Sequence, residues 1–385
     1  MTRLDDSSKS GHLRGARRYI CLAPGSLRIE NPFMRIPSTI PLLLLAVGPL
    51  AHAAQPVPDN PTPQADVERG TVSIYFENDL FGGTDRFYTN GTKLGWSSTD
   101  LAKFSDTLWA SPLLPLINNL PFVNNPAFQK NLAFSLGQNI YTPDDTESRV
   151  VVKDDRPYAG WLYVGLGLVW KNAAVRHSLV LNVGVVGSWS YAEQSQKAVH
   201  EARDLGVPQG WDNQLHNELG VLAVYEAKWR WPVRERRSGL DWEFLPHAGA
   251  ALGNVQIYAN LGGEFRFGIN LPDDFGTSGI DAASTTSTPV EGRQQAARTD
   301  AVDLGLYLFA RADGRVVARN IFLDGNTFGN SHSVDRKWLV GDLAVGASVN
   351  YKNTKLTYSL VYRTKEFDTQ EEGQLFGSIS VNYAF

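Results

Sequence analysis

The sequence predicts an all-β fold, a twelve-stranded antiparallel transmembrane β-barrel with a short helix in an extracellular loop. Three observations favour this class. From Thr71 onward, apolar and polar residues alternate, which is typical of strands with one apolar face. The alternating segments are about 9–12 residues long, the span of a tilted strand through a bilayer. Aromatic residues gather at segment ends, as in the interfacial girdles of membrane barrels: Trp96, Trp161, Trp170, Trp229, Trp231 and Tyr383.

The alternation is clearest at the end of the chain. In residues 375–385 the apolar side chains share one face, and residues 356–363 repeat the pattern. Such strands would also suit a water-soluble sandwich. The chain ends on the apolar face with Phe385, however, and this ending resembles the C-terminal signature of bacterial outer-membrane proteins.

Twelve strands are expected along the chain. Because the number is even, the C-terminus returns to the N-terminal, periplasmic side of the membrane. The connection between the eighth and ninth strands is long for a periplasmic turn. The expected strands are residues 70–79, 87–98, 129–139, 158–170, 177–188, 218–231, 241–252, 255–269, 301–324, 337–351, 354–366 and 374–385.

The N-terminal region predicts export. Residues 34–53 combine a basic start, an apolar run and a small-residue cleavage signal, which is the anatomy of a secretory signal peptide. A membrane helix is the alternative, but the run is short and interrupted by prolines. We therefore expect residues 1–33 to be a non-native upstream extension, with translation starting at Met34. Pro-rich residues 54–69 form a disordered lead-in to a barrel of residues 70–385.

The composition excludes several classes. Removal of residues 1–53 takes away 7 of 36 Lys and Arg residues and 3 of 40 Asp and Glu residues, which leaves a net charge of −8. This balance gives no basic surface for nucleic acid. The same cleavage removes Cys21, the chain's one cysteine, so neither disulfides nor thiolate chemistry apply to the mature chain.

The topology brings distant polar residues to one end of the barrel. Strand 1 runs outward, so Asn78 and Asp79 reach the outer rim, and Thr89 lies beside them at the start of strand 2. The loop between strands 3 and 4 carries Lys153 to the same rim, and the loop between strands 5 and 6 carries His200. Alternation also turns both Asp79 and Thr89 inward, away from lipid.

The first candidate for chemistry is the run Glu77-Asn78-Asp79, followed by residues 84–91. Carboxylate and amide oxygens close together suit a hard cation such as Ca²⁺. Asn, Asp and Gly are also ordinary turn residues, and the run taken alone favours a polar hairpin turn.

The second candidate is the charged segment 153–156. Lys153 can donate to an oxyanion or a phosphate, and Arg156 can pair bidentately with a carboxylate or phosphate. The alternative is a solvated loop in which Arg156 braces Asp155, and for Arg156 we favour this structural role.

The third candidate is residues 192–204, which contain good helix formers and are followed by Gly206 and Pro208 as a stop. A helix on an outer rim is unusual, and it carries His200. Histidine is the usual general base near neutral pH, although a lone histidine is more often a surface residue. No Gly-x-Ser-x-Gly elbow and no Cys/His metal spacing exists in the sequence. Four other histidines rank lower: His177, His216, His247, for which no partner is evident, and His332.

At these residues the chain resembles the lipid A 3′-O-deacylase (LpxR) family of Gram-negative outer membranes. The resemblance rests on several separated motifs in order: END-x-F and TDR-x-YTNG (77–91), GQ-x-IYTP (137–143), DRPYAGWLY (155–163) and GWDNQL (210–215). Together they cover the first six expected strands, and the barrel length and C-terminal form agree for the rest.

The resemblance implies a site between the barrel wall and a helical outer loop. On the matching positions, Asn78 and Asp79 would bind or orient Ca²⁺, and Thr89 and Lys153 would belong to the catalytic set. His200 would take a proton from the water that attacks the ester carbonyl. Ca²⁺, helped by Lys153, would stabilise the negative charge that develops on oxygen.

The implied protein is a carboxylic ester hydrolase that removes a 3′-acyloxyacyl chain from the lipid A of lipopolysaccharide in the bacterial outer membrane. We expect a monomer without a nucleic-acid partner. One alternative is an outer-membrane phospholipase A, for which the adjacent Ser331 and His332 are a poor geometry. The other is a non-catalytic, porin-like barrel, although Tyr75, Phe87 and Phe376 favour a filled interior.

Overall fold

The computed structural model describes residues 70–79, 87–101, 104, 125–204, 206–233, 239–277 and 304–385. The expected upstream extension, signal peptide and lead-in, residues 1–69, lie outside the described residues and stay predictions. In the described part of the chain, no helix is long and apolar enough to cross a membrane.

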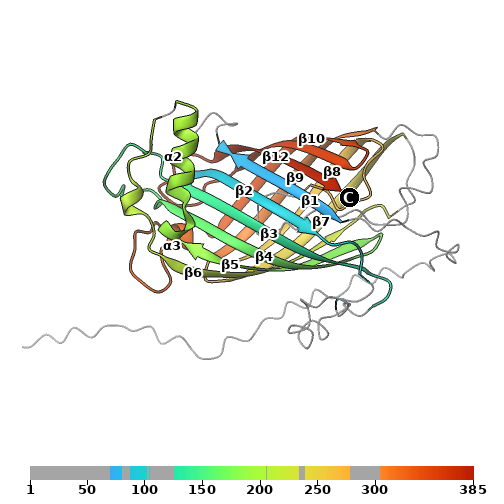
Figure 1. Ribbon diagram of the computed structural model, residues 1–385, viewed down its shortest axis with the longest axis horizontal. Helices are drawn as coiled ribbons and strands as arrows, with labels where there is room; N and C mark the ends of the chain where they lie inside the picture. The colour runs from blue at the N-terminus through green and yellow to red at the C-terminus, as the bar shows by residue number, and fades with distance from the viewer. Residues whose placement is uncertain are drawn as a thin grey trace, which may run out of the picture. The chain divides into compact units, whose positions relative to one another are not determined.

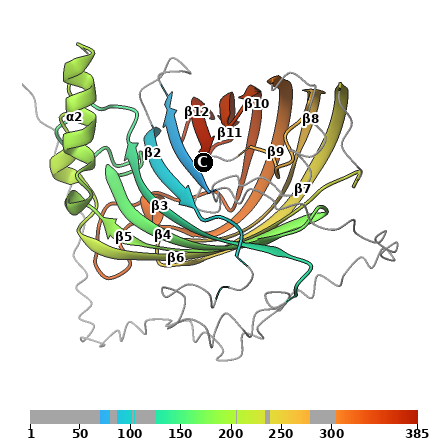
Figure 2. The same cartoon turned by 45° about the vertical axis from the view of Figure 1, so that its right-hand side comes forward.

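Twelve antiparallel strands close into a barrel (Figure 1), and Figure 2 shows the curvature of its wall. Each strand pairs with its neighbours in sequence, and β1 (Thr71–Asn78) closes the sheet by pairing with β12 (Gln374–Ala384). The predicted number and order of strands are confirmed. The other strands are β2 (Phe87–Ser97), β3 (Gln129–Thr142), β4 (Ala159–Lys171), β5 (Val175–Val186), β6 (Glu218–Trp229), β7 (Leu240–Gly253), β8 (Gln256–Ile269), β9 (Leu304–Asn320), β10 (Leu339–Tyr351) and β11 (Thr354–Arg363).

The ninth strand is shorter than predicted. We expected residues 301–324, but β9 ends at Asn320 and a short helix, α3 (Ile321–Asp324), follows. The side-chain oxygen of Asn320 accepts a hydrogen bond from the N–H of Phe322 (3.1 Å), which caps the helix at its start. This local cap ends the strand where the apolar pattern alone would continue it.

The barrel wall is apolar on its outside and polar on its inside. Along β11, Leu356, Tyr358 and Tyr362 are exposed, whereas Thr357 and Arg363 are buried. A water-soluble sandwich would bury the apolar face instead. Exposed apolar residues that alternate with buried polar ones are the signature of a wall that faces lipid, so the predicted transmembrane barrel is confirmed.

Two of the six aromatic residues assigned to interfacial girdles are buried. Trp161 is buried and stacks on Tyr163, with ring centroids 4.2 Å apart, because both lie on the inward face of β4. Trp170 is covered by Phe104 and Leu132. The other four are exposed as expected: Trp96, Trp229, Trp231 and Tyr383.

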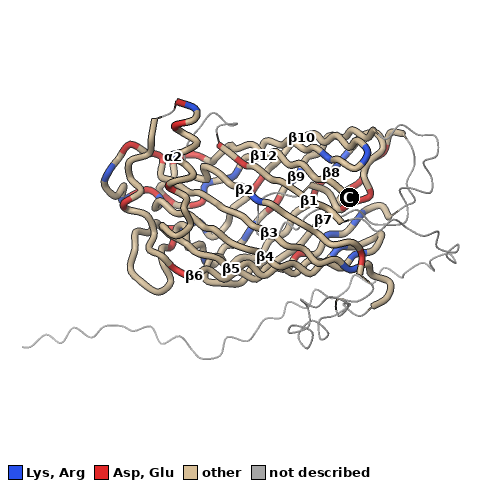
Figure 3. The backbone as a smooth tube through the Cα atoms, viewed as in Figure 1, with Lys and Arg blue, Asp and Glu red and all other residues tan. Residues whose placement is uncertain are grey.

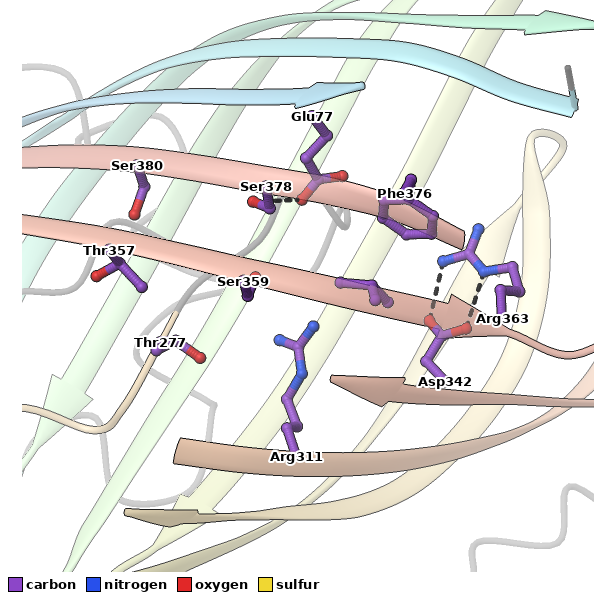
Figure 4. A pocket seen from close by; sticks show the side chains of 11 residues that line it. Glu77, Thr277, Arg311, Asp342, Thr357, Ser359, Arg363, Phe376, Ser378 and Ser380 are labelled. Carbon is purple, nitrogen blue, oxygen red and sulfur yellow. Dashed lines mark hydrogen bonds and ion pairs between the residues drawn. The ribbon is translucent and has the colours of Figure 1, made fainter. Parts of the chain in front are cut away.

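Charged side chains fill much of the interior in compact networks. Arg363 donates to the two carboxylate oxygens of Asp342 through Nε and Nη2, each at 2.9 Å (Figure 4), and Arg315 pairs with the same carboxylate. His247 Nε2 lies 2.8 Å from Asp313 Oδ2, which identifies the partner that the sequence did not reveal. Figure 3 shows charged residues gathered toward the two ends of the barrel. These pairs permit a polar interior because a buried charge is costly without a partner.

The residues that directly follow β8, up to Thr277, fold back into the barrel. Asp274 accepts hydrogen bonds from Arg266 (2.6 Å) and Lys355 (2.7 Å), and Thr277 bonds to Glu264. Burial alone would raise the pKa of Asp274, but Lys355 and Arg266 hold that pKa below its usual range. Residues 271–277 thus occupy the lumen at the end where β8 finishes.

Candidate functional site

The Asn78–Asp79 pair lies where β1 ends, beside the start of β2. Asn78 pairs with Asn90, and its side-chain Nδ2 donates a hydrogen bond of 2.9 Å to the main-chain carbonyl of Thr89. Asp79 follows directly and is 0% exposed. The structure therefore brings Asn78, Asp79 and Thr89 together at one end of the barrel, which we call the outer rim.

Thr89 does not point into the lumen as alternation predicts. The pairing of β2 with β3 shifts between Tyr88 and Asn90, so Thr89 is the extra residue of a β-bulge. Its hydroxyl lies 2.7 Å from the hydroxyl of Thr142. Thr142 has the parity of Ile140, which packs against the rim helix outside the wall. The bulge therefore moves Thr89 to the lipid-facing side, and the inward assignment was wrong for this residue.

The predicted rim helix is α2 (Ala192–Ala202), which packs against β3 and β4 (Figure 1). Its buried residues, Ala192, Gln196 and His200, are four residues apart and so share one helix face. The close approach requires Gly160, because a Cβ at that position would lie 2.2 Å from the Cβ of Ala192. A small residue in β4 thus fixes α2 against the outside of the wall.

His200 is held in a defined orientation on this face. It is 3% exposed, and its Nδ1 lies 2.6 Å from the carbonyl oxygen of Gly206. A carbonyl can only accept, so Nδ1 carries the hydrogen and the lone pair of the neutral ring is on Nε2. The neighbouring Gln196 accepts a hydrogen bond from Trp211 Nε1 (2.9 Å), which ties the helix to the segment that follows it.

Lys153 lies in the connection between β3 and β4 and is exposed. The residues after it are anchored from across the rim: Asp154 O accepts from Thr369, and Asp155 O accepts from His332 Nε2 (2.6 Å). Burial raises the pKa of the Asp155 carboxyl, against two main-chain hydrogen bonds that lower it. Lys153 is thus a solvent-exposed cation next to a main-chain segment that these two hydrogen bonds hold in place.

Arg156 has the structural role we expected, with a different partner. Its main-chain N–H donates to Asp155 Oδ1 (2.7 Å), but the guanidinium pairs with Glu366 (3.1 Å) and lies over the ring of Tyr141 (4.8 Å). It braces the β3–β4 connection against the β11–β12 connection and does not stand out for a substrate.

The comparisons with known proteins agree with this architecture. A family model described as "Outer membrane protein LpxR" matches residues 40–385. The chain belongs to the LpxR family. It is accordingly a protein of the bacterial outer membrane, as predicted.

Two solved structures resemble the chain to different degrees, and only the first match is strong enough to support the fold. LpxR from Salmonella typhimurium is 22% identical, with a TM-score of 0.64, and the match covers 82% of this chain and 100% of that chain. The β domain of the Bordetella autotransporter BrkA is 11% identical, with a TM-score of 0.39 and coverage of 83% and 99%. No curated protein sequence matches the chain.

The residues of the LpxR motifs form the surface of the wall against which α2 packs, which we call the seat of α2. Gln138, from the GQ-x-IYTP motif, donates to the carbonyl of Ser190 just before the helix (2.6 Å). Tyr158, from DRPYAGWLY, packs on Trp211 of GWDNQL with ring centroids 4.9 Å apart. Gly160 supplies the close approach to Ala192. The motif residues thus converge on the lipid-facing side of the rim.

The polar groups at the end of β1 and the start of β2 suit a hard cation in type. They are a carboxylate from Asp79, the amide of Asn78, and the carbonyl and hydroxyl of Thr89. Among the described residues, no group of three or more His, Cys, Asp or Glu side chains lies close enough to hold a metal ion. A Ca²⁺ ion here would therefore rely on neutral oxygens, water or substrate beside one carboxylate, and the Ca²⁺ assignment stays a prediction.

Three polar residues of this LpxR rim were not singled out from the sequence. Thr142 lies inside the GQ-x-IYTP motif, so the motif itself was a signal for it. Gln196 is four residues before His200, so helical spacing would have placed it on the same face. Gln374 occupies an inward position at the start of the last strand, and its contact with Tyr88 depends on where β1 ends.

Proposed function

We propose that the chain is a lipid A deacylase that hydrolyses the ester-linked 3′-acyloxyacyl chain of lipopolysaccharide. Membership of the LpxR family supports the reaction class. The observation that carries the proposal is the place of Thr89 and α2 on the lipid-facing side of the rim. A substrate in the outer leaflet reaches this position laterally, with its acyl chains in the bilayer and its head group at the rim.

In this mechanism His200 is the general base. Its Nδ1–H is held by the Gly206 carbonyl, so Nε2 takes the proton from the attacking water and returns it to the alcohol oxygen when the acyl C–O bond breaks. The hydrogen bond keeps the ring in one tautomer and one orientation throughout the reaction. Burial of His200 on the wall-facing side of α2 separates this proton transfer from bulk solvent.

The negative charge that develops on the ester oxygen needs an electrophile. Asp79 and Asn78 would hold Ca²⁺, which supplies Lewis-acid stabilisation of that charge when bound. Lys153 contributes a further cation from the exposed rim, and the Thr89 hydroxyl orients the reacting group. No serine nucleophile and no covalent intermediate enter this scheme.

The two competing functions lack comparable support. For a phospholipase with a serine nucleophile, Ser331 and His332 are the neighbouring pair. The Nε2 of His332 donates to the Asp155 carbonyl, however, and the Ser331 hydroxyl accepts from the N–H of Asn326 (2.8 Å). A pore would need an open lumen. The lumen instead holds α3 near one end and residues 271–277 near the other.

One experiment separates these functions. The purified protein, refolded in detergent micelles with Ca²⁺, is incubated with lipid A and with phospholipid separately, and the products are identified by mass spectrometry. We expect loss of one acyloxyacyl chain from lipid A, intact phospholipid and no single-channel conductance in planar bilayers. Intact lipid A in all conditions, or cleavage of phospholipid instead, would reject the proposal. We further propose that the active protein is a monomer.

A further inference from the structure

The strand β1 ends before its two neighbours do. Its last residue, Asn78, pairs with Gly377 of β12 on one side and with Asn90 of β2 on the other. Both neighbours extend further toward the outer rim, and β12 begins three residues earlier, at Gln374. The hydrogen-bond ladder of the wall is therefore interrupted where the chain leaves β1 through Asp79.

The side chain of Gln374 bridges this interruption. Its Oε1 accepts a hydrogen bond from the N–H of Tyr88 (3.1 Å), and its Nε2 donates to the carbonyl of Tyr88 (3.0 Å). A side-chain amide thus makes with Tyr88 the paired hydrogen bonds that a neighbouring strand residue would make. Gln374 is 2% exposed, so removal of the amide would leave two buried main-chain groups without these bonds.

The segment held by Gln374 is irregular on both sides of Tyr88. Phe87 has a φ of +67°, in the left-handed region that a bulky residue rarely adopts. Thr89 is the extra residue of the bulge. Strain of this kind persists only where the surroundings enforce it, and it gathers at functional sites. Tyr88 therefore lies between two irregular residues, and Gln374 holds its main chain in place.

We propose that Gln374 is a positioning residue for the deacylase site, acting from the lumen through Tyr88 and the bulge. It keeps the Thr89 hydroxyl at Thr142 and the Thr89 carbonyl at Asn78, on the opposite side of the wall. Gln374 shares the inward face of β12 with Phe376, so it does not touch a substrate on the lipid-facing side. The catalytic consequence rests on the proposed function, whereas the hold on Tyr88 does not.

Two variants of Gln374 test this inference. Gln374→Met keeps the length of the side chain and removes both hydrogen bonds. Gln374→Glu keeps the acceptor for the Tyr88 N–H and loses the donor to its carbonyl. The matched control is Asn382→Leu, since Asn382 is another buried amide on β12 that bonds to β1, through Ser73 (2.6 Å) and Tyr75 (3.2 Å), far from the bulge.

The readouts are hydrogen exchange of the segment 87–90 by mass spectrometry, kcat and KM on lipid A, and the heat-modifiable gel mobility of a folded barrel. We expect faster exchange of residues 87–90 and a kcat about 10- to 100-fold lower in Gln374→Met, because a displacement of about 1 Å can cost 10²-fold. KM should stay within about twofold. The exchange rate and kcat of Gln374→Glu should lie between those of Gln374→Met and wild type. Asn382→Leu should change neither the exchange rate nor kcat.

Unchanged exchange, or an unchanged kcat in folded Gln374→Met, would overturn the positioning role. If Gln374→Met does not fold, Gln374→Glu decides in the same way. If the wild-type protein does not deacylate lipid A, the proposed function fails. Faster exchange in the variants would then still support the hold on Tyr88, and unchanged exchange would reject that as well.

Discussion

The hydroxyl oxygens of Thr89 and Thr142 lie 2.7 Å apart on the lipid-facing side of the barrel wall. Thr89 belongs to a β-bulge, and that single inserted residue moves its side chain from the polar interior to the side on which α2 packs. Thr89 thereby lies on the side that a lipid substrate would reach, and not in the filled lumen. A barrel wall with a helix outside it can in this way present polar chemistry to a membrane-embedded ester.

Loss of the Thr89 hydroxyl should impair the site without unfolding the barrel. Thr89→Val keeps the shape of the side chain and removes the hydrogen bond to Thr142, so we expect a kcat about 10- to 100-fold lower. The control is Thr92→Val, three residues along the same strand, which should retain wild-type turnover. Equal kcat values for Thr89→Val and wild type, measured on lipid A micelles, would remove Thr89 from the site.

The seat of α2 at Gly160 should be intolerant of any side chain. In Gly160→Ala the new Cβ would meet the side chains of Ser190 and Ala192 at about 2 Å, so α2 must move away from β4. Because the helix carries His200, we expect at least about a tenfold loss of kcat in a folded barrel. Gly329→Ala, where a Cβ meets nothing within 4 Å, is the control. Full activity of Gly160→Ala would contradict the assigned role of the helix.

The inward segment 271–277 should contribute to stability through Asp274. Asp274→Asn removes the carboxylate between two buried cations, Arg266 and Lys355, and such a change costs about 3–5 kcal/mol of unfolding free energy. Urea unfolding in detergent micelles measures it. Asp368→Asn breaks an exposed pair with Lys337 and should cost under about 1 kcal/mol. Similar small effects of both variants would show that the segment is not anchored in this way.

The same ion pairs predict a pH dependence at the acid end. The folded-state pKa of Asp274 lies below its ordinary value of 3.8, so the ionised carboxylate stabilises the fold at all higher pH values. This contribution is lost as the pH falls below 3.8 toward the folded-state pKa. The difference in unfolding free energy between wild type and Asp274→Asn should be constant between about pH 5 and 8 and shrink below about pH 4. A difference that grows on acidification would contradict the assignment.

Removal of Ca²⁺ should abolish deacylation. We expect a chelator to stop turnover and added Ca²⁺ to restore it, with Mg²⁺ less effective because it demands tighter octahedral geometry. Asp79→Asn should raise the Ca²⁺ concentration needed for half-maximal activity by about tenfold or more, since it removes the one carboxylate of the donor set. Glu201→Gln, an exposed carboxylate on α2, should leave that concentration unchanged. Undiminished turnover in excess chelator would rule out the metal.

Much of the fold follows from alternation because one face of every strand meets lipid. Leu356, Tyr358 and Tyr362 predicted the outer face of β11 without any tertiary information. The inward course of residues 271–277 did not follow, since a segment with Pro, Gly and two Asp residues resembles a loop until Arg266 and Lys355 are brought beside it. His247 likewise found its partner, Asp313, only across the register of β7, β8 and β9.

The sequence predicted the end of the barrel at which the site residues lie, but not the face of the wall on which they lie. Parity carried Asn78 and Thr89 to one rim, and the hydrogen bond between them confirms that the two lie together. The composition around Thr89 does not indicate a bulge. One extra residue nevertheless reverses the face on which the residues beyond it lie. Gln374 was hidden for a related reason, since its contact with Tyr88 exists only because β1 stops early.

The general base is the centre of the account, and its removal is the most direct test. His200→Ala, compared with wild type and with His216→Ala, an exposed histidine of the same connection, is assayed for the acyl chain released from lipid A by mass spectrometry. We predict a folded barrel whose kcat is about 10²- to 10⁴-fold lower in His200→Ala, and unchanged turnover in His216→Ala. Wild-type release by folded His200→Ala would contradict the account.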